Sequence, residues 1–425
     1  MSPSALSPSI ADVTITPIAV VDPPLLNSVG VHQRFALRSI LQVRTDDGLV
    51  GISEAYGDNP TLERLRLAAA ELTGLSIWDL NGLSHRVAIA LGEVAPDSPT
   101  ELVGAPSVAK SIASTVSAFE VALYDLQGKA TGLRVCDLLG GAVREAVPFS
   151  AYLFYKWAGH PGDDPDTFGE ALDPDGIVAQ AKALVDRYGF GSLKLKGGVF
   201  APAEEIAAIR ALREAFPDHP LRLDPNANWS PATSHRVAAE LTGLLEYLED
   251  PTDGLVDMAV VAAGTDIPLA TNMCVTTFDD IPEAVRLGSV KIILSDHHFW
   301  GGFRASQKLA GVCETFGLGL SMHSNTHLGV SLAAMTHLAA AIPNLTYACD
   351  THSVWQIEEV IRPGDIEIRD GAVRVPDGPG LGVHIDDDAL GRLHEQYLSC
   401  GIRRRDDVTP MRVRHPEWTG ARPRF

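Results

Sequence analysis

The chain has 425 residues and a formal net charge of −20, with 54 acidic residues against 34 basic ones. This balance disfavours a sequence-independent binder of nucleic acid or of anionic lipid, and it favours a small-molecule partner. The length suits two or three domains, or a small domain beside an α/β barrel of about 250 residues. Only eight of the basic residues are lysines, so any cluster of lysines is informative.

Five dispersed cysteines form no CxxC pair, which argues against a disulfide framework and against a thiolate zinc site. This use of cysteine predicts a reducing, cytoplasmic location. The first twenty residues lack the basic start and the apolar stretch of a signal peptide. The most apolar later stretch, Leu328 to Ile342, is too short to span a bilayer, so no membrane partner is expected.

The first third of the chain reads as strands followed by helices. Strands are predicted from about Asp12 to Tyr56, with a hairpin turn at residues 46–48. Helical spacing of apolar residues follows over Asn59 to Thr73 and over Ala109 to Ala130, the second ending at Gly132. We therefore expect an α+β domain over residues 1–140.

From Val147 onward, eight short apolar runs alternate with helical patterns. The polar residues that end seven of these runs recur about 22 to 28 residues apart, which is one strand, one helix and two loops. This repeat predicts a (β/α)8-type barrel over residues 141–356, with its chemistry at the C-terminal ends of the strands. The strand-end residues are Lys196, Asp224, Glu249, Asn272, Asp296, His323 and Asp350, and the expected helices include Pro202–Phe216, Pro231–Leu241, Thr277–Leu287, Phe303–Phe316 and Thr326–Ala341.

The last segment, residues 357–425, contains a hairpin pattern and an Arg-rich tail, and we expect it to pack back on the first domain.

Asp224, Glu249 and Asn272 end three consecutive strands and bring oxygen-bearing side chains to one barrel mouth. Such a set suits a hard divalent cation, and Mg²⁺ accepts a few protein oxygens while keeping positions for water and substrate. Each residue alone is more often a turn starter than a ligand, because Asp-Pro-Asn and Glu-Asp-Pro commonly begin turns. Their shared register on successive strands favours the metal site.

Lys194 and Lys196 lie two residues apart in SLKLKGG, so a strand directs them to the same face. They could be a solvent-facing edge pair. The scarcity of lysine and the neighbouring cation site instead favour a proton-transfer role, because mutual repulsion and a nearby metal lower the pKa of a lysine.

His323 lies in GLSMHSNTH, and Asp296 ends the preceding strand. A carboxylate there can fix the tautomer of the histidine and prepare it as a general acid or base, although a lone strand-end histidine is more often structural. The nearby histidines would also allow a zinc site, but no HExxH pattern is present. Together, the strand-end residues suit proton abstraction next to a carboxylate.

Several stretches resemble the enolase superfamily, specifically the D-glucarate dehydratases: SLKLKGGVF, LDPNANWS, LEDP, ATNM, SDHHFW, SMHSNTHLG and ACDTH, with LLNSVGVH near the start and RRRDD near the end. The resemblance covers nearly the whole chain. It implies that both ends of the chain form a capping domain, which covers the barrel and contributes to specificity, and that Mg²⁺ is the cofactor. We also expect a homo-oligomer.

The resemblance implies a role for each site residue. Lys196 would be the base on one face of the acid sugar, and His323, paired with Asp296, the base on the other. Lys194 would neutralise the substrate carboxylate, and His323 would protonate the departing hydroxyl to give 5-dehydro-4-deoxy-D-glucarate. Asp224, Glu249 and Asn272 would bind Mg²⁺, and the implied substrate contacts are His32, Tyr152, Asn226, Ser324, Asn325, His352 and Arg405.

Bases on both faces imply that L-idarate could enter as well as D-glucarate. The sequence departs from the family pattern at Ala-Asn in LDPNANWS and in a short loop after Glu249, which leaves open another acid sugar such as galactarate or a monoacid, or low activity on glucarate. If the substrate is a diacid, His32 and Arg405 should approach its distal carboxylate. A non-catalytic binding protein is disfavoured, because a binder has no need of two opposed bases.

Overall fold

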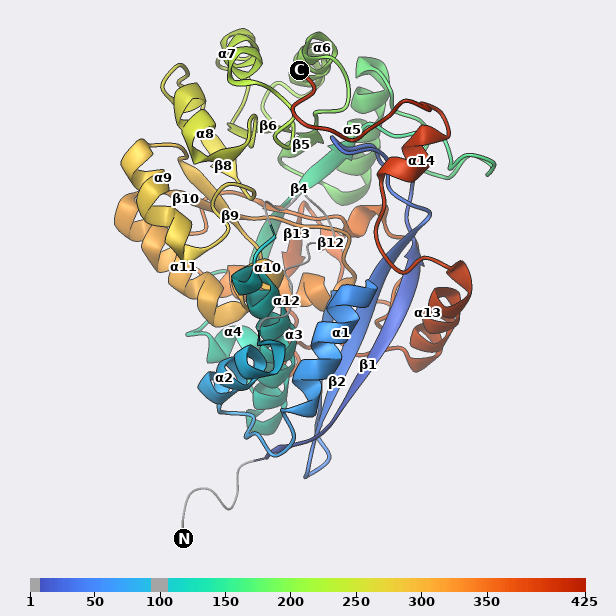
Figure 1. The fold of residues 1–425 in the computed structure, drawn as a ribbon, viewed down its shortest axis with the longest axis vertical. Helices are drawn as coiled ribbons and strands as arrows, with labels where there is room; N and C mark the ends of the chain where they lie inside the picture. The colour runs from blue at the N-terminus through green and yellow to red at the C-terminus, as the bar shows by residue number, and fades with distance from the viewer. Residues whose placement is uncertain (1–7, 93–105) are drawn as a thin grey trace.

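The computed structural model describes residues 8–92 and 106–425, and the N-terminal part of it is a sheet covered by helices. Three antiparallel strands pair in the order β1-β2-β3. Figure 1 shows this sheet and its helices together at one end of the molecule. The elements are β1 (Ile10–Val21), β2 (Phe35–Thr45), β3 (Val50–Tyr56), α1 (Asn59–Ala70), α2 (Leu80–Leu91), α3 (Val108–Thr131) and α4 (Val135–Leu138). The first seven residues, which belong to the stretch without a signal-peptide pattern, lie outside the described residues.

The second part is the predicted barrel of parallel strands. Each of the eight apolar runs contains one strand, and neighbouring strands from β4 to β10 pair in sequence order, with β11 on the other side of β4. The Oγ of Ser321 on β10 donates a hydrogen bond of 2.9 Å to the carbonyl of Ala348, just before β11, and so joins the two ends of the sheet. The strands are β4 (Ala146–Phe154), β5 (Leu193–Lys196), β6 (Leu221–Asp224), β7 (Tyr247–Glu249), β8 (Leu269–Thr271), β9 (Ile292–Ser295), β10 (Gly319–Met322) and β11 (Cys349–Asp350).

Helices follow these strands on the outside of the barrel (Figure 1). The five expected helices are present, each within a few residues of its predicted limits. The helices are α5 (Pro174–Tyr188), α6 (Pro202–Ala215), α7 (Pro231–Glu240), α8 (Gly254–Ala262), η3 (Phe278–Asp280), α9 (Ile281–Leu287), α10 (His297–Trp300), α11 (Phe303–Phe316) and α12 (Gly329–Ala341).

The eighth unit departs from the strand-and-helix repeat. After β11 the chain makes only the 3-10 turn η4 (Ser353–Trp355), and then the hairpin of β12 (Ile368–Arg369) and β13 (Ala372–Arg374). β13 pairs antiparallel with the start of β4. Prolines at positions 363, 376 and 379 disfavour a helix in this stretch because each lacks a backbone N–H.

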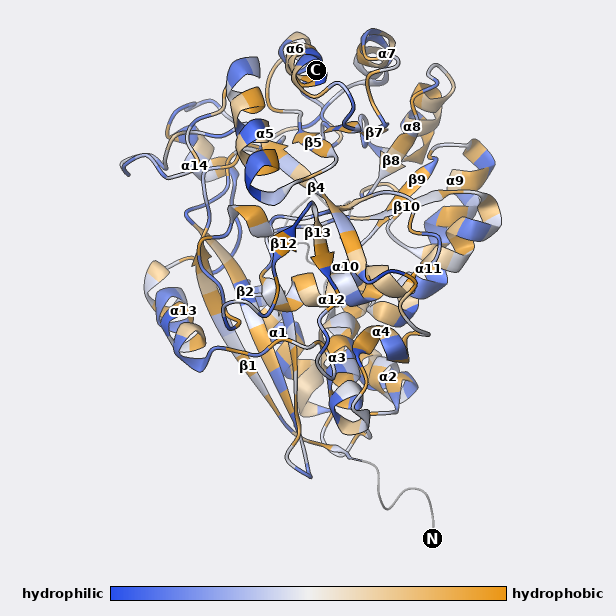
Figure 2. Cartoon of the chain, turned by 180° about the vertical axis from the view of Figure 1, so that it is seen from behind, coloured by the Kyte–Doolittle hydropathy of each residue, from blue (hydrophilic) through white to orange (hydrophobic). Residues whose placement is uncertain are grey.

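The barrel strands are buried on both faces, as expected for a parallel sheet covered by helices. All four residues of β5, and all four of β6, are buried. Figure 2 shows mainly apolar residues along the barrel strands, whereas the outer helices alternate between apolar and polar residues. A separate apolar cluster, which includes Leu41, Leu65 and Phe119, lies between the N-terminal sheet and its helices.

The C-terminal segment contacts both parts of the molecule. Helix α13 (Asp387–Cys400) lies along β1, where Nδ1 of His394 is 2.7 Å from the carbonyl of Pro17. The short helix α14 (Val408–Arg412) follows, and the chain then runs to the barrel, where Arg424 N donates to the carbonyl of Asn228 at 3.0 Å. None of the described helices is both long and apolar enough to cross a membrane.

Candidate active site

The candidate site lies at the C-terminal ends of the barrel strands. Lys196, Asp224 and Glu249 are the last residues of β5, β6 and β7, and Asn272 directly follows β8. The parallel register pairs Lys196 with Asp224, so their side chains start side by side. The strand-end pattern in the sequence therefore placed these residues correctly at one mouth of the barrel.

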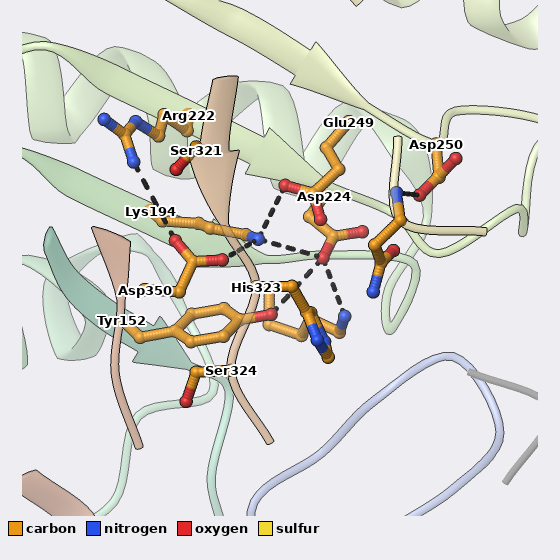
Figure 3. Close-up of polar contacts among 12 residues, drawn as sticks. Tyr152, Lys194, Arg222, Asp224, Glu249, Asp250, Ser321, His323, Ser324 and Asp350 are labelled. Atoms are coloured by element: carbon orange, nitrogen blue, oxygen red, sulfur yellow. Dashed lines mark hydrogen bonds and ion pairs between the residues drawn. The ribbon is translucent and has the colours of Figure 1, made fainter. Parts of the chain in front are cut away.

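Lys194 lies among carboxylates at the centre of this mouth (Figure 3), and Lys196 pairs with one of them. Nζ of Lys194 lies 2.6 Å from Oε2 of Glu249, 2.6 Å from Oδ2 of Asp350 and 3.5 Å from Oδ2 of Asp224. Nζ of Lys196 lies 2.7 Å from the same oxygen of Asp224. Both lysines are buried, so the solvent-facing alternative is excluded for this pair.

The charges shift the pKa values of these groups strongly. Burial lowers the pKa of Lys194, but Asp350 and Glu249 outweigh burial and hold that pKa well above its ordinary value. The expected lowering of a lysine pKa by repulsion therefore does not hold for Lys194, which stays cationic. Burial raises the pKa of Asp224, but Lys196 and Lys194 outweigh it and bring the pKa to about 2. Burial and the charge of Asp224 raise the pKa of Glu249 well above its ordinary value.

The residues at this mouth fit a hard divalent cation. Glu249 Oε1 and Asn272 Oδ1 are buried and have no hydrogen-bond partner among the described residues. Buried polar atoms normally have a partner, so two orphaned oxygens on adjacent strands beside the Asp224 carboxylate indicate a place for a ligand that accepts oxygen donors. Two carboxylates and one amide oxygen form a set that Mg²⁺ accepts.

Asp250 holds Asn272 in place. Asp250 adopts a positive φ of 38°, an uncommon conformation for a non-glycine residue. Its Oδ2 accepts a hydrogen bond of 2.9 Å from Asn272 N, and its Oδ1 accepts one of 2.5 Å from the Thr271 hydroxyl. The strained turn thus fixes the backbone from which the Asn272 amide projects.

His323 and Asp296 form the predicted pair. Nδ1 of His323 lies 3.1 Å from Oδ2 of Asp296, and both residues are buried. A carboxylate on Nδ1 selects the tautomer and makes Nε2 the nitrogen available for proton exchange. Asn272, Asp296 and His323 line one small cavity together with Lys110. The His323–Asp296 pair therefore adjoins the oxygen set, by which we mean the side-chain oxygens of Asp224, Glu249 and Asn272.

The histidines around this pair fit a zinc ion poorly. Among the described residues, ligand atoms of Asp296, His297 and His298 come close enough together to share a metal. Asp296, however, is already paired with His323, and Nη2 of Arg38 lies 3.4 Å from Nε2 of His298. A guanidinium at that distance repels a second cation.

The predicted substrate-contact residues of the barrel surround the same mouth. Oη of Tyr152 donates to Oδ2 of Asp224 at 3.3 Å, and its ring lies 4.8 Å from the ring of His352. The Ser324 hydroxyl is 3.2 Å from Nδ1 of His352. Asn226 N donates to Oδ1 of Asp224 at 3.0 Å.

Asn325 follows Ser324 in the loop after β10. Its Nδ2 is buried and forms no well-aligned hydrogen bond among the residues that the structure describes, although the Tyr56 hydroxyl lies nearby. Such an orphaned donor is open to a ligand.

Two predicted contacts come from the capping part of the molecule. His32, in the loop between β1 and β2, pairs with Asp22 at 2.9 Å, and Arg405 pairs with Asp407 at 2.7 Å. Both line one cavity, which Thr326 of the barrel also borders. The structure thus brings His32 and Arg405 together, but each is already engaged by a carboxylate.

Sequence reasoning missed three residues near the site. Asp350 was recognised as a strand-end residue but given no role, although it pairs with Lys194 at 2.6 Å. Tyr56 and Lys110 belong to the capping part, where no repeat points to a site, and each lines a cavity that borders the predicted residues. The only signal for Lys110 was the scarcity of lysine.

This arrangement places a lysine and a histidine–aspartate pair on strands nearly opposite each other in the barrel, with oxygen ligands on the strands between them. The N-terminal part and the barrel of this chain each match a protein-family model. Residues 10–140 match the mandelate racemase / muconate lactonizing enzyme N-terminal domain, and residues 176–389 match the enolase C-terminal domain-like family. The chain belongs to the enolase superfamily.

Individual proteins of the superfamily are similar to this chain over nearly its whole length. The chain is 54% identical over 423 residues to a "Probable glucarate dehydratase" of Streptomyces coelicolor, covering 96% of this chain and 97% of the relative. An enolase of Mycobacterium smegmatis, crystallised with formate and acetate, is 59% identical with a TM-score of 0.95 and 99% coverage of both chains. An enolase of Thermobispora bispora, crystallised with magnesium and formate, is 56% identical with a TM-score of 0.96, covering 98% of this chain and 100% of that one.

Proposed function

We propose that this protein is an Mg²⁺-dependent acid-sugar dehydratase that converts D-glucarate, and also L-idarate, to 5-dehydro-4-deoxy-D-glucarate. The observation that supports this most is the pairing of two candidate bases, Lys196 on β5 and His323 after β10, across a mouth that also holds the oxygen set. The name of the Streptomyces coelicolor relative agrees with this substrate.

In the proposed reaction, a base removes the proton on C5, next to the substrate carboxylate. Lys196 serves one face of the sugar and His323 the other, which explains why two C5 epimers can react. The electron pair from the broken C–H bond forms the C4–C5 double bond, and the C4 hydroxyl leaves as water with a proton from His323. The enol that remains tautomerises to the 5-keto product.

The other residues stabilise the charge that develops. Lys194 stays cationic among Glu249 and Asp350, so it neutralises the carboxylate that becomes more electron-rich as the proton leaves. Asp224, Glu249 and Asn272 would hold Mg²⁺, which supplies further positive charge beside that carboxylate. Asp296 orients His323 through Nδ1.

The test is turnover of a panel of acid sugars by the purified protein with Mg²⁺, followed by NMR. We expect D-glucarate and L-idarate to give the same 4-deoxy-5-keto diacid. Turnover of galactarate or of a monoacid instead would transfer the proposal to that substrate. The absence of both product and C5 proton exchange with every aldarate tested would refute it.

A further inference from the structure

Tyr56 is a buried phenol at the boundary between the capping part and the barrel. It is the last residue of β3, and its side chain lines the cavity that His32, Arg405 and Thr326 also border. Its electrostatic neighbours include Asp296 of the barrel and Arg405 of the C-terminal segment. The Tyr56 side chain thus lies within electrostatic range of a barrel carboxylate and of a cap guanidinium.

The ring of Tyr56 is held firmly by its surroundings. The guanidinium carbon of Arg38 lies 4.4 Å from the ring centroid, and Arg38 itself pairs with Glu54 at 2.7 Å. The ring of Phe299 packs at 5.5 Å and that of His298 at 5.9 Å. A ring fixed on several sides points its hydroxyl in one direction, which is what a recognition group requires.

The Tyr56 hydroxyl faces the side-chain amide of Asn325, but the two groups form no well-aligned hydrogen bond. Oη of Tyr56 is buried and has no hydrogen-bond partner among the described residues. Thr326 Oγ1, in the same cavity, and Nδ2 of the adjacent Asn325 are orphaned in the same way. A polar ligand with several oxygens would satisfy these three side chains together.

The chemistry of the hydroxyl restricts what it can bind. Burial raises the pKa of Tyr56 above its ordinary value, and Arg38 opposes this shift, so the phenol stays protonated at neutral pH. A protonated phenol donates to hydroxyl and carboxylate oxygens. Nε and Nη2 of Arg405 donate hydrogen bonds to the Asp407 carboxylate. Nη1 of Arg405 takes no part in that pair, so this nitrogen can donate a second hydrogen bond to the substrate beside Tyr56.

We propose that Tyr56 is a specificity-determining residue, whose hydroxyl donates a hydrogen bond to the half of the acid sugar that is remote from the reacting carbons. This inference rests on the proposed function for the orientation of the substrate, with its reacting end at Lys194. Removal of the hydroxyl then weakens substrate binding with little effect on the fold, because the free protein loses no well-aligned hydrogen bond.

The experiment compares Tyr56→Phe with Tyr124→Phe, a matched removal of a phenol oxygen on α3, where the Tyr124 ring packs 5.4 Å from Phe303. We expect kcat/KM for D-glucarate to fall about 10- to 100-fold in Tyr56→Phe, mainly through a higher KM. The melting temperature should be unchanged, and Tyr124→Phe should behave like the wild type. An unchanged KM, or a fall in activity that parallels a fall in melting temperature, would overturn the role of Tyr56.

A binding measurement separates this inference from the proposed function. D-Glucarate and galactarate are titrated calorimetrically, with Mg²⁺ present, into His323→Asn and into the same variant that also carries Tyr56→Phe. Weaker binding by the double variant supports the inference even if the wild type turns over neither sugar. Equal binding by the two variants, or no binding by either, contradicts it.

Discussion

The buried pair of His323 and Asp296 has a counterpart on the surface with the same distance between its atoms. This second pair provides a control for mutating the first. Nδ1 of His384 lies 3.1 Å from Oδ2 of Asp365, the same distance as in the buried pair. Asp296→Asn should lower kcat about 10²- to 10⁴-fold, because the amide no longer selects the tautomer that exposes a basic Nε2. Steady-state kinetics with Asp365→Asn as the control check this, and equal activity of Asp296→Asn and the wild type would contradict it.

The sequence identified site residues on the strands far better than those on the cap. Lys194, Lys196 and the oxygen set were found because the barrel repeat fixes where each strand ends. Tyr56 stands at the end of an ordinary cap strand, and its position near Arg405 depends on how two distant segments fold together. Local pattern contains no signal for such a contact, so only the structure could show it.

Among the elements, the loop after β6 is held by the end of the chain. Asn226 and Ala227 have positive φ values of 50° and 57°, at the place where the sequence departs from the family pattern. Arg422 Nη1 donates to the Asn226 carbonyl at 2.9 Å, and Arg424 N donates to Oδ1 of Asn228 at 3.0 Å. These contacts hold a left-handed turn that glycine would adopt more readily.

Arg424 connects that loop to the cap. Its guanidinium donates to the carbonyls of Val199 and Ser28 and stacks 3.9 Å from the ring centroid of Trp418. Arg424→Met keeps the aliphatic stem and removes these contacts, so residues 225–230 and 28–31 should exchange backbone hydrogens faster. Hydrogen–deuterium exchange measures this, with Arg392→Met at an exposed position of α13 as the control. Unchanged exchange in both loops would show that the tail does not hold them.

A buried histidine on α12 makes the junction of three segments sensitive to pH. Nδ1 of His337 accepts from Cys136 N at 3.3 Å, and its Nε2 lies 3.1 Å from the Leu381 carbonyl. Burial lowers its pKa from 6.5 to about 4, with the Leu381 carbonyl opposing the shift. Between pH 6.5 and 4 this histidine is therefore protonated in the unfolded chain but not in the folded one. The free energy of unfolding falls by on the order of 3 kcal/mol as the pH drops over this range.

Urea unfolding of His337→Gln at pH 7.5 and pH 5 tests this linkage. The variant should be less stable at pH 7.5 but should lose less stability than the wild type on acidification. The exposed His85→Gln serves as the control and should follow the wild type. Parallel losses in His337→Gln and the wild type would rule out this histidine as the source.

At the scale of the molecule, the oxygen set should couple metal binding to stability. Without metal, Glu249 and Asp224 repel each other in a buried site, and burial raises the pKa of Glu249. Mg²⁺ at 100 times its dissociation constant should add about 2.7 kcal/mol to the free energy of unfolding. Thermal unfolding with EDTA and with Mg²⁺ should therefore differ by a few degrees.

Glu249→Gln should lose this Mg²⁺ shift, whereas Glu214→Gln, at an exposed position of α6, should keep it. An Mg²⁺ shift that survives in Glu249→Gln would place the metal elsewhere.

The architecture was largely predictable, and its exceptions have physical reasons. The strands and outer helices follow from short buried runs alternating with amphipathic ones, and the family models agree with an enolase-type barrel and cap. The missing eighth helix follows from prolines between η4 and α13. The domain limits at residues 140 and 356, the cytoplasmic location and the homo-oligomer stay predictions.

The central claim is that Lys196 and His323 act on opposite faces of one acid sugar. Its most direct test is the reaction of His323→Asn with D-glucarate, L-idarate and Mg²⁺ in deuterated water, followed by NMR. The account predicts no dehydration product, and deuterium at C5 of only the epimer whose proton faces Lys196. Continued formation of the 4-deoxy-5-keto diacid by this variant, or deuterium at C5 of both epimers without product, would contradict it.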